Sequence, residues 1–431
     1  MKLRIITLLL LVPPLSLAQR KPAANDGPWR LVSIHTTGSQ RFSEVDIVAT
    51  TGLRVGAEVT PNDMKAAADR LATLGAFEEV SYEYGPAGTG VKLDFKLADA
   101  PEFLTTTFDN FVWFTDHELT DAVRRTVPLF HGAVPTEGEM LGQVTDALQA
   151  LLAERHIPGT VRFQLEAERP EAKVRSGVFL IDGIEIKIAE IKFPGASAEQ
   201  AQFLAPASSR LRDLPFQRST VRSFAELNLR PVFLQHGYLK AQFGEPQATL
   251  VGSGPASPSI AVSIPVTPGL QYRLGALRWS GNRALQTFDL DRLLHVRVGA
   301  PADLVQLQRD LEAVHAAYAS RGYLREQTRE VPTYDDSVQV VSYELQVNEG
   351  DQYKFGSVEI VGLDAKLRNR VRSEWSMRED DPYDPAYVKT FLRAALALLP
   401  PGAVTRVSQD INDQTRTVEV VLQFEFQQPI R

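Results

Sequence analysis

An internal repeat is the feature that most constrains how this chain folds. Seven positions between residues 266 and 281 recur 81 residues later with the same residue type or class. The matched pairs are Val266 and Val347, Gly269 and Gly350, Tyr272 and Tyr353, Arg273 and Lys354, Leu274 and Phe355, Gly275 and Gly356, and Gly281 and Gly362. Weaker copies of the run end at Gly195 and Gly38. A repeat of this period predicts an array of small units that are all built in the same way.

Each unit has the same expected order of elements. Largely alternating apolar residues before the closing glycine, as in 186–193, predict a strand with one buried face. Two helices follow, and in the first unit Thr60 caps the second helix, which begins with Pro61 and ends before Gly75. A hairpin closes the unit. The sequence therefore predicts an α+β chain of β-α-α-β-β modules, with two helices over one face of a small three-stranded sheet.

The spacing of the repeat divides the chain into five modules. Gly195, Gly281 and Gly362 are 86 and 81 residues apart, whereas Gly38 and Gly195 are 157 residues apart, so a degenerate unit lies between these two. We expect a signal peptide at 1–18 and modules at 29–98, 101–182 (degenerate), 183–267, 268–348 and 351–427. The predicted structural turn glycines are Gly38, Gly75, Gly195, Gly237, Gly281, Gly322 and Gly362. Short linkers predict an elongated, curved rod.

The first residues have the pattern of an export signal. Lys2 and Arg4 precede a short apolar run, and small residues up to Ala18 suit a signal peptidase, which predicts cleavage before Gln19. The alternative, a membrane anchor, needs about 18 apolar residues. The sequence predicts no later spanning segment either. The chain has no cysteine, which excludes disulfides, thiolate metal sites and a lipid-bearing cysteine.

The marker residues resemble those of the polypeptide-transport-associated (POTRA) repeat of outer-membrane barrel-assembly proteins. A strand end of the form apolar-x-Gly-Asn occurs at 279–282, and Gly-aromatic pairs precede the second strand at Gly237 and Gly322. In the first unit, residues 75–80 match the equivalent family run. The resemblance covers residues 29–426. In the family such repeats precede a membrane barrel, and because only five residues follow Phe426 we expect none here, and no channel or insertase function.

The resemblance implies that the chain binds proteins. A small sheet with helices on one face leaves an edge strand with unpaired backbone groups, to which an extended chain can add itself. The first hypothesis is a chaperone-like periplasmic scaffold, peripheral to the outer membrane at most, that engages unfolded outer-membrane β-barrel proteins or a separate assembly subunit. The alternative is a structural spacer with one folded partner.

By family analogy the second strand of each unit is the exposed edge. The expected segments are 80–84, 161–165, 238–243 and 323–329. The predicted binding residues are Val80, Tyr82, Tyr84, Val161, Phe163, Tyr238, Lys240, Gln242, Tyr323, Arg325, Gln327 and Arg329. The alternative is that these strands only complete the sheet, with charges such as Glu326 and Arg329 protecting the edge from aggregation.

The sequence predicts no enzyme. It has no nucleophile elbow, phosphate-binding loop or paired catalytic carboxylates. The seven histidines lack the spacing of a helical zinc site, and the acidic loop 379–384 is better interpreted as solvated than as a calcium site. We expect no cofactor, metal or small-molecule substrate. The net charge of -7 argues against nucleic acid and anionic lipid as main partners. A third alternative, a binder or hydrolase of envelope polymers, needs a groove of carboxylates and aromatics that the sequence does not contain.

Overall fold

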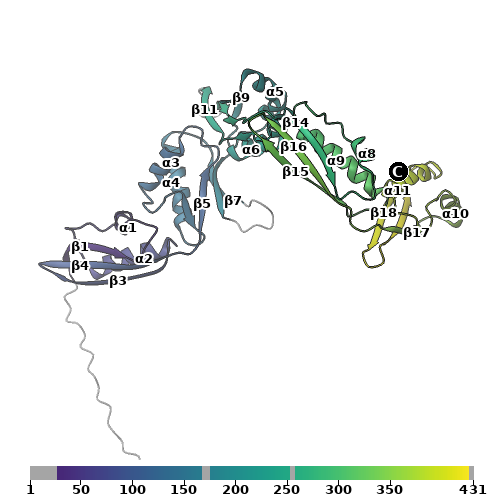
Figure 1. The fold of residues 1–431 in the computed structure, drawn as a ribbon. Coiled ribbons are helices and arrows are strands. Elements are labelled where there is room, and N and C mark those ends of the chain that lie inside the picture. The colour runs from purple at the N-terminus through teal and green to yellow at the C-terminus, as the bar shows by residue number, and fades with distance from the viewer. Residues whose placement is uncertain (1–26, 167–174, 253–257, 427–431) are drawn as a thin grey trace, which may run out of the picture. The chain divides into compact units, whose positions relative to one another are not determined.

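A computed structural model describes residues 27–166, 175–252 and 258–426 of the chain. The chain divides into two compact units, Met1–Ile184 and Glu185–Arg431. Both units mix helices and strands, so the predicted α+β class is confirmed (Figure 1). The expected signal peptide, 1–18, lies outside the described residues.

The first sheet belongs to the first unit and has the strand order β2-β1-β4-β3. Its elements are β1 (Trp29–Thr37), α1 (Glu44–Thr51), β2 (Glu58–Val59), α2 (Pro61–Thr73), β3 (Phe77–Ala87) and β4 (Gly90–Asp99). Strands β1 and β4 are parallel, whereas β3 and β4 form an antiparallel hairpin. Parallel strands need a crossover connection, which here contains both helices. Thr60 caps α2 as predicted, and Asp63 completes a capping box with it.

The second sheet, also in the first unit, repeats this plan with the order β6-β5-β8-β7. Its elements are β5 (Phe103–Phe108), α3 (Asp116–Arg124), β6 (Ala133–Pro135), α4 (Met140–Glu154), β7 (Thr160–Glu166) and β8 (Ser176–Asp182). A single hydrophobic cluster runs through both sheets and includes Phe95 of β4 and Leu148 of α4. The two sheets of this unit therefore share one core.

The third sheet begins the second unit and has the order β11-β12-β9. Its helical part is broken into several short segments, and a separate ladder pairs β10 with β13. The elements are β9 (Lys187–Lys192), α5 (Ala198–Ser208), η1 (Ser209–Asp213), α6 (Arg218–Phe224), η2 (Ala225–Leu229), α7 (Arg230–Gln235), β10 (Gln242–Phe243), β11 (Gln247–Gly252), β12 (Ser259–Ser263) and β13 (Val266–Thr267).

The fourth and fifth sheets follow in the second unit with the orders β14-β16-β15 and β17-β19-β18. The fourth contains β14 (Arg273–Ser280), α8 (Thr287–Asp291), α9 (Leu304–Ala319), β15 (Gln327–Asp335) and β16 (Val340–Asn348). The fifth contains β17 (Lys354–Val361), α10 (Ala365–Ser373), α11 (Pro385–Ala397), β18 (Ala403–Asn412) and β19 (Thr417–Phe426). Each expected module range holds one of these five sheets, and 183–267 also holds the two-stranded ladder of β10 and β13. The number of modules and their exact boundaries stay predictions.

The closing glycines have one structural role. A Cβ added to any of them would lie 2.0–2.1 Å from a carbonyl oxygen of a neighbouring strand, a distance that real Cβ atoms do not reach. The pairs are Gly38 with Leu97, Gly195 with Val266, Gly281 with Val347, and Gly362 with Phe424. All four glycines also have positive φ. In the second sheet, which has no such glycine, the side chain of Asn110 bonds the backbone N–H and C=O of Ile181 instead.

Candidate functional site

Apart from the short strands β2, β6, β10 and β13, each sheet has three strands, and the second of these in the chain, which begins the hairpin, lies at the edge of the sheet. The first and third of them pair in parallel, so the third occupies the middle and the hairpin places the second outside. These hairpin edge strands are β3, β7, β11, β15 and β18, and the opposite edges of the same sheets are β2, β6, β9, β14 and β17. Within the described residues, one side of each has no strand partner, so its outward backbone groups can bond an added strand. This topology agrees with the expectation from the sequence, and a binding role for these edges stays a prediction.

Seven of the predicted binding residues lie on edge strands. They are Val80, Tyr82 and Tyr84 on β3, Val161 and Phe163 on β7, and Gln327 and Arg329 on β15. Several of their side chains point into the core: Val161 is buried, and the Phe163 ring lies 4.9 Å from that of Phe179. An added strand would therefore reach the backbone of these residues rather than most of their side chains.

The expectation that 238–243 forms the edge strand of the third sheet is wrong. Tyr238 and Lys240 lie in a turn, and Gln242 belongs to the two-residue β10, which pairs with β13. The Tyr238 N–H donates to the Phe233 carbonyl at 3.0 Å, as in a Schellman helix end. The Gly-aromatic pair thus terminates a helix, and the edge strand begins later, at β11.

The same correction applies to Tyr323 and Arg325, which precede β15 rather than belong to it. The Tyr323 N–H donates to the Tyr318 carbonyl at 3.1 Å, and the two rings pack edge to face. Gly322 before it has φ of 84°, the left-handed conformation that this helix end requires. Arg325 instead pairs with Asp413, beyond β18.

The degenerate second module keeps this helix end without a glycine. His156 has φ of 55°, and the next residue, Ile157, donates its N–H to the Leu152 carbonyl at 2.9 Å. A histidine after a helix with no flanking glycine gives little sequence signal, because residues other than glycine adopt this conformation rarely, even though Asn, Asp and His do so more often than the rest.

The edge strands differ in how well they are protected against strand addition. Charges or prolines interrupt four of them. These residues are Glu78, Glu79, Glu83 and Pro86 on β3, Arg162 and Glu166 on β7, Arg329, Glu330, Pro332 and Asp335 on β15, and Arg406 and Asp410 on β18. Strand β11, with the sequence QATLVG, has neither, and its Leu250 and Val251 are 38% and 55% exposed. Sequence reasoning placed this segment in a hairpin but assigned the edge to its wrong part.

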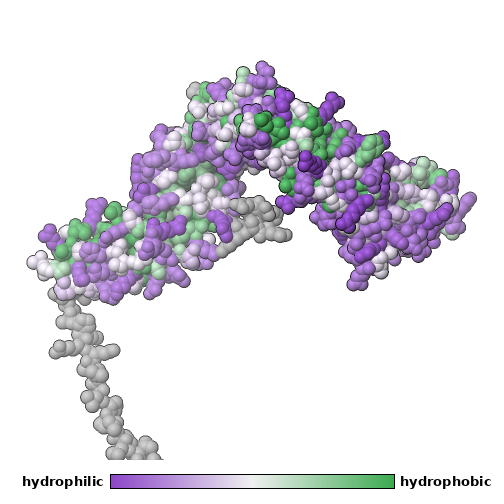
Figure 2. Space-filling model, in the orientation of Figure 1, coloured by the Kyte–Doolittle hydropathy of each residue, from purple (hydrophilic) through white to green (hydrophobic). Residues whose placement is uncertain are grey.

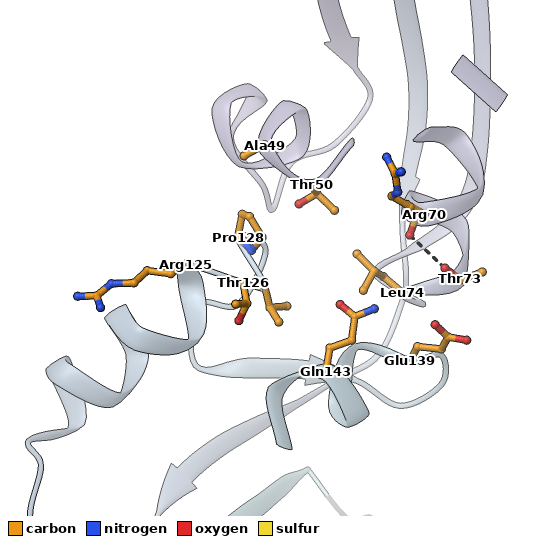
Figure 3. A pocket seen from close by; sticks show the side chains of 11 residues that line it. Ala49, Thr50, Arg70, Thr73, Leu74, Arg125, Thr126, Pro128, Glu139 and Gln143 are labelled. Atoms are coloured by element: carbon orange, nitrogen blue, oxygen red, sulfur yellow. Dashed lines mark hydrogen bonds between the residues drawn. The ribbon is translucent and has the colours of Figure 1, made fainter. Parts of the chain in front are cut away.

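Two cavities lie among the described residues of the first unit. One of about 340 Å³ lies in the first unit, where the C-terminal ends of α1, α2 and α3 meet the start of α4 (Figure 3). Arg70 and Arg125 line it together with Glu139, and the Arg70 guanidinium donates to the Thr51 carbonyl. Cations suit the C-terminal ends of helices, so Arg70 here stabilises the C-terminal end of α1. A second cavity, of about 350 Å³, is lined by Trp29 and Tyr84 at the end of β3.

The buried acidic groups act within the fold. Asp310 accepts the N–H groups of His295 and Val296 and a bond from Gln306. Burial alone would raise the pKa of Asp310, but these bonds outweigh it and lower the pKa below its usual 3.8. No group of three or more His, Asp or Glu side chains in the described part of the chain could hold a metal ion. Nor does any helix found there have the length and apolarity to cross a membrane.

On the face of the molecule drawn in Figure 2, hydrophilic residues predominate and hydrophobic residues occur in separate patches. Backbone edges, rather than a broad apolar surface, are therefore the more distinctive candidate for binding.

Comparison with known proteins gives a family match, a named relative and similar solved structures. Residues 272–350 match the family model described as POTRA, surface antigen variable number repeat. A protein of Treponema pallidum (strain Nichols) named as an outer membrane protein assembly factor is 21% identical over 272 residues, which is 58% of this chain and 32% of that protein. The chain thus matches about a third of the length of this relative.

Solved structures with similarity include POTRA3-5 of BamA from Haemophilus influenzae, with 19% identity, a TM-score of 0.42, and coverage of 62% of this chain and 99% of that one. POTRA1-3 of Omp85 from Anabaena is 16% identical, with a TM-score of 0.26 and coverage of 56% and 96%. The resemblance to POTRA proteins that the sequence predicted is confirmed by the family match to residues 272–350 and by the named relative.

Proposed function

We propose that this chain, which carries a POTRA repeat at 272–350, is a periplasmic scaffold that binds proteins by strand addition. The bound segments are extended parts of outer-membrane β-barrel proteins or of a separate subunit of their assembly machinery. The named relative, an outer membrane protein assembly factor, supports this choice of partner. The predicted signal peptide supports the location.

The observation that carries the proposal is the composition of β11. Soluble proteins protect edge strands with charges, prolines or bulges, and four of the edges described here contain such residues. The six residues of β11 contain neither charge nor proline, and two large apolar side chains on it are exposed. Its ladder to β12 has one register shift, between Leu250 and Gly252, so a local bulge is the one protection that this edge has. An edge left open in this way favours binding of a strand over simple completion of the sheet.

Strand addition also suits the proposed partners. Affinity comes from main-chain hydrogen bonds, which every sequence can form, and side-chain pockets add modest selectivity. A binder of this kind accepts many β-rich chains. Unfolded barrel proteins are such chains, because their strands share an alternating pattern and differ in sequence.

A structural spacer is the second candidate function. It is favoured by Pro332 and Glu330 in the middle of β15, because a proline cannot donate to an added strand and a charge opposes aggregation. In this reading the fourth sheet only links its neighbours, and the chain has a single folded partner.

The test introduces proline separately at Thr249 and Leu250 of β11. Neighbouring N–H groups in an edge strand point in opposite directions, so one of the two prolines removes an outward donor and spares the ladder to β12. A photoreactive residue at Val251 captures partners in the periplasm. A synthetic peptide with the alternating pattern of a membrane β-strand measures affinity.

We expect one proline variant to weaken peptide binding about tenfold or more while circular dichroism stays unchanged, and Leu250→Ala to bind nearly as the wild type does. Capture of many barrel proteins, or of an assembly subunit, supports the proposal. Unchanged binding in both folded proline variants would overturn strand addition at β11. Capture of one folded partner would favour the spacer.

A further inference from the structure

Two junctions in the second unit have the same backbone contacts. Where the third sheet meets the fourth, the Tyr272 N–H donates to the Gly237 carbonyl at 2.8 Å and the Gln271 side chain donates to the His236 carbonyl at 2.9 Å. Where the fourth meets the fifth, the equivalent bonds run from Tyr353 to Gly322 at 2.7 Å and from Gln352 to Arg321 at 2.9 Å. At both junctions, the residues that begin one module donate hydrogen bonds to carbonyl groups at the helix end of the module before it.

The two junctions also have the same side-chain contacts. The Tyr272 hydroxyl donates to the Asp336 carboxylate at 2.6 Å, and the Lys240 ammonium lies 3.1 Å from the same oxygen. We call these three residues the Asp336 clamp. In the Asp413 clamp, the Tyr353 hydroxyl donates to Asp413 at 2.5 Å and the Arg325 guanidinium lies 3.4 Å away. One cation, one tyrosine and one aspartate recur in the same arrangement.

The marker glycines permit this close approach. A Cβ on Gly237 would lie 2.5 Å from the Tyr272 carbonyl oxygen, and one on Gly322 would lie 2.3 Å from the Tyr353 carbonyl oxygen. Both glycines have positive φ as well. The tyrosine rings are almost fully buried in the junctions, at 0% and 4% exposure, although their hydroxyls reach the surface carboxylates.

Each clamp holds the tip of an edge-strand hairpin. Asp336 follows directly after β15, and Asp413 follows directly after β18. The cation of each clamp comes from the preceding module, just after its Gly-aromatic helix end. Lys240 also lies 4.5 Å from the ring of Tyr334, which belongs to β15. The clamp therefore links the orientation of an edge strand to the body of the module before it.

We infer that the Asp336 and Asp413 clamps lock the third, fourth and fifth sheets into fixed relative orientations, so that the edges β15 and β18 move with the module that precedes each of them. The inference is independent of strand binding, because it concerns contacts within the chain. The corresponding glycine of the first sheet, Gly75, faces the carbonyl of Glu137 instead. The clamp is therefore a property of the second unit among the described residues.

The test measures distances between spin labels on introduced cysteines, which is direct because the chain has no native cysteine. Leu227 and Val298 are exposed positions on either side of the first junction, and Val298 and Lys389 lie on either side of the second. The variants Asp336→Ala and Asp413→Ala each remove one clamp. Asp410→Ala removes an exposed carboxylate from the same hairpin as Asp413 and is the control.

We expect Asp336→Ala to widen the distribution of distances at the first junction about twofold and to leave the second unchanged, with the reverse for Asp413→Ala. Tyr272→Phe, which keeps the ring and loses the hydroxyl, should also widen the first. The control should change neither distribution. Unchanged widths in both aspartate variants, with circular dichroism as in the wild type, would overturn the inference. Equal widening at both junctions in every variant would overturn it too.

Discussion

At the scale of single residues, many of the recurring positions of the repeat are glycines. Two properties decide whether a glycine is required at a position: its backbone conformation and the room that neighbouring atoms leave for a Cβ. Gly281 and Gly299 have the same φ of 84°. A Cβ on Gly281 would lie 2.1 Å from the Val347 carbonyl oxygen, whereas one on Gly299 would have no atom within 4 Å. The left-handed conformation is therefore equally unfavourable for alanine at both positions, and only one of them adds a collision with backbone.

We expect Gly281→Ala to lower the free energy of unfolding by about 3 kcal/mol or more, and Gly299→Ala to lower it by about 1 kcal/mol, the usual cost of a left-handed alanine. Urea unfolding of the two variants measures the difference. Equal losses would mean that the collision at Gly281 is relieved by movement of the strand.

Asp310 predicts a dependence of stability on pH. Its pKa is lowered in the folded chain, so its hydrogen bonds stabilise the fold fully above the ordinary value of 3.8 and lose this effect as the pH falls through the folded pKa. We expect Asp310→Asn to be less stable than the wild type at pH 7 by about 1–3 kcal/mol, since the buried donors lose a charged acceptor. The difference should shrink steadily below about pH 4. A difference that stays constant down to pH 2 would contradict this.

At the scale of elements, local sequence rules account for the helices well. Thr60 and Asp63 form the predicted start of α2 by bonding each other's backbone N–H groups. The Gly-aromatic pairs, interpreted from the sequence as the start of strands, are helix ends whose aromatic N–H returns to a carbonyl five residues earlier. Both devices satisfy backbone groups that a helix leaves unpaired at its ends.

We expect Thr60→Ala to lower the free energy of unfolding by about 1 kcal/mol, because the α2 cap loses its acceptor. Thr60→Ser keeps the hydroxyl and should change stability by only a few tenths of a kcal/mol. Thermal or urea unfolding of both variants compares the two. A serine variant as unstable as the alanine one would assign the effect to the threonine methyl group.

At the scale of the whole molecule, the two units differ in how their hydrophobic cores are divided among the sheets. In the first unit one hydrophobic cluster joins both sheets, whereas the fifth sheet of the second unit has a cluster of its own. A contact across the first unit reinforces the shared core: Asp46 of α1 accepts from Arg124 of α3 and contacts His131, each at 3.1 Å. Damage to one sheet of this unit should therefore weaken the other.

We expect Leu148→Ala in α4 to destabilise the first unit by about 2–5 kcal/mol, since Leu148 is fully buried. Hydrogen exchange should become faster in β4 as well as in β8, because these strands belong to the two sheets that share the core. Amides of β19 serve as the control and should exchange as in the wild type. Faster exchange confined to β8 would show that the two sheets unfold separately.

The amino-acid sequence by itself determined the repeat, the marker glycines, the helix cap at Thr60 and the α+β class. These features arise from interactions between residues close in the chain, so their patterns are visible in the sequence. Only the tertiary structure decided that β11, rather than 238–243, is the edge of the third sheet. It also decided that Lys240 meets Asp336, 96 residues away. Strand order and such contacts depend on how segments that are distant in the sequence pack against one another. Residues that meet in this way have no regular separation along the chain, so no sequence pattern reveals them.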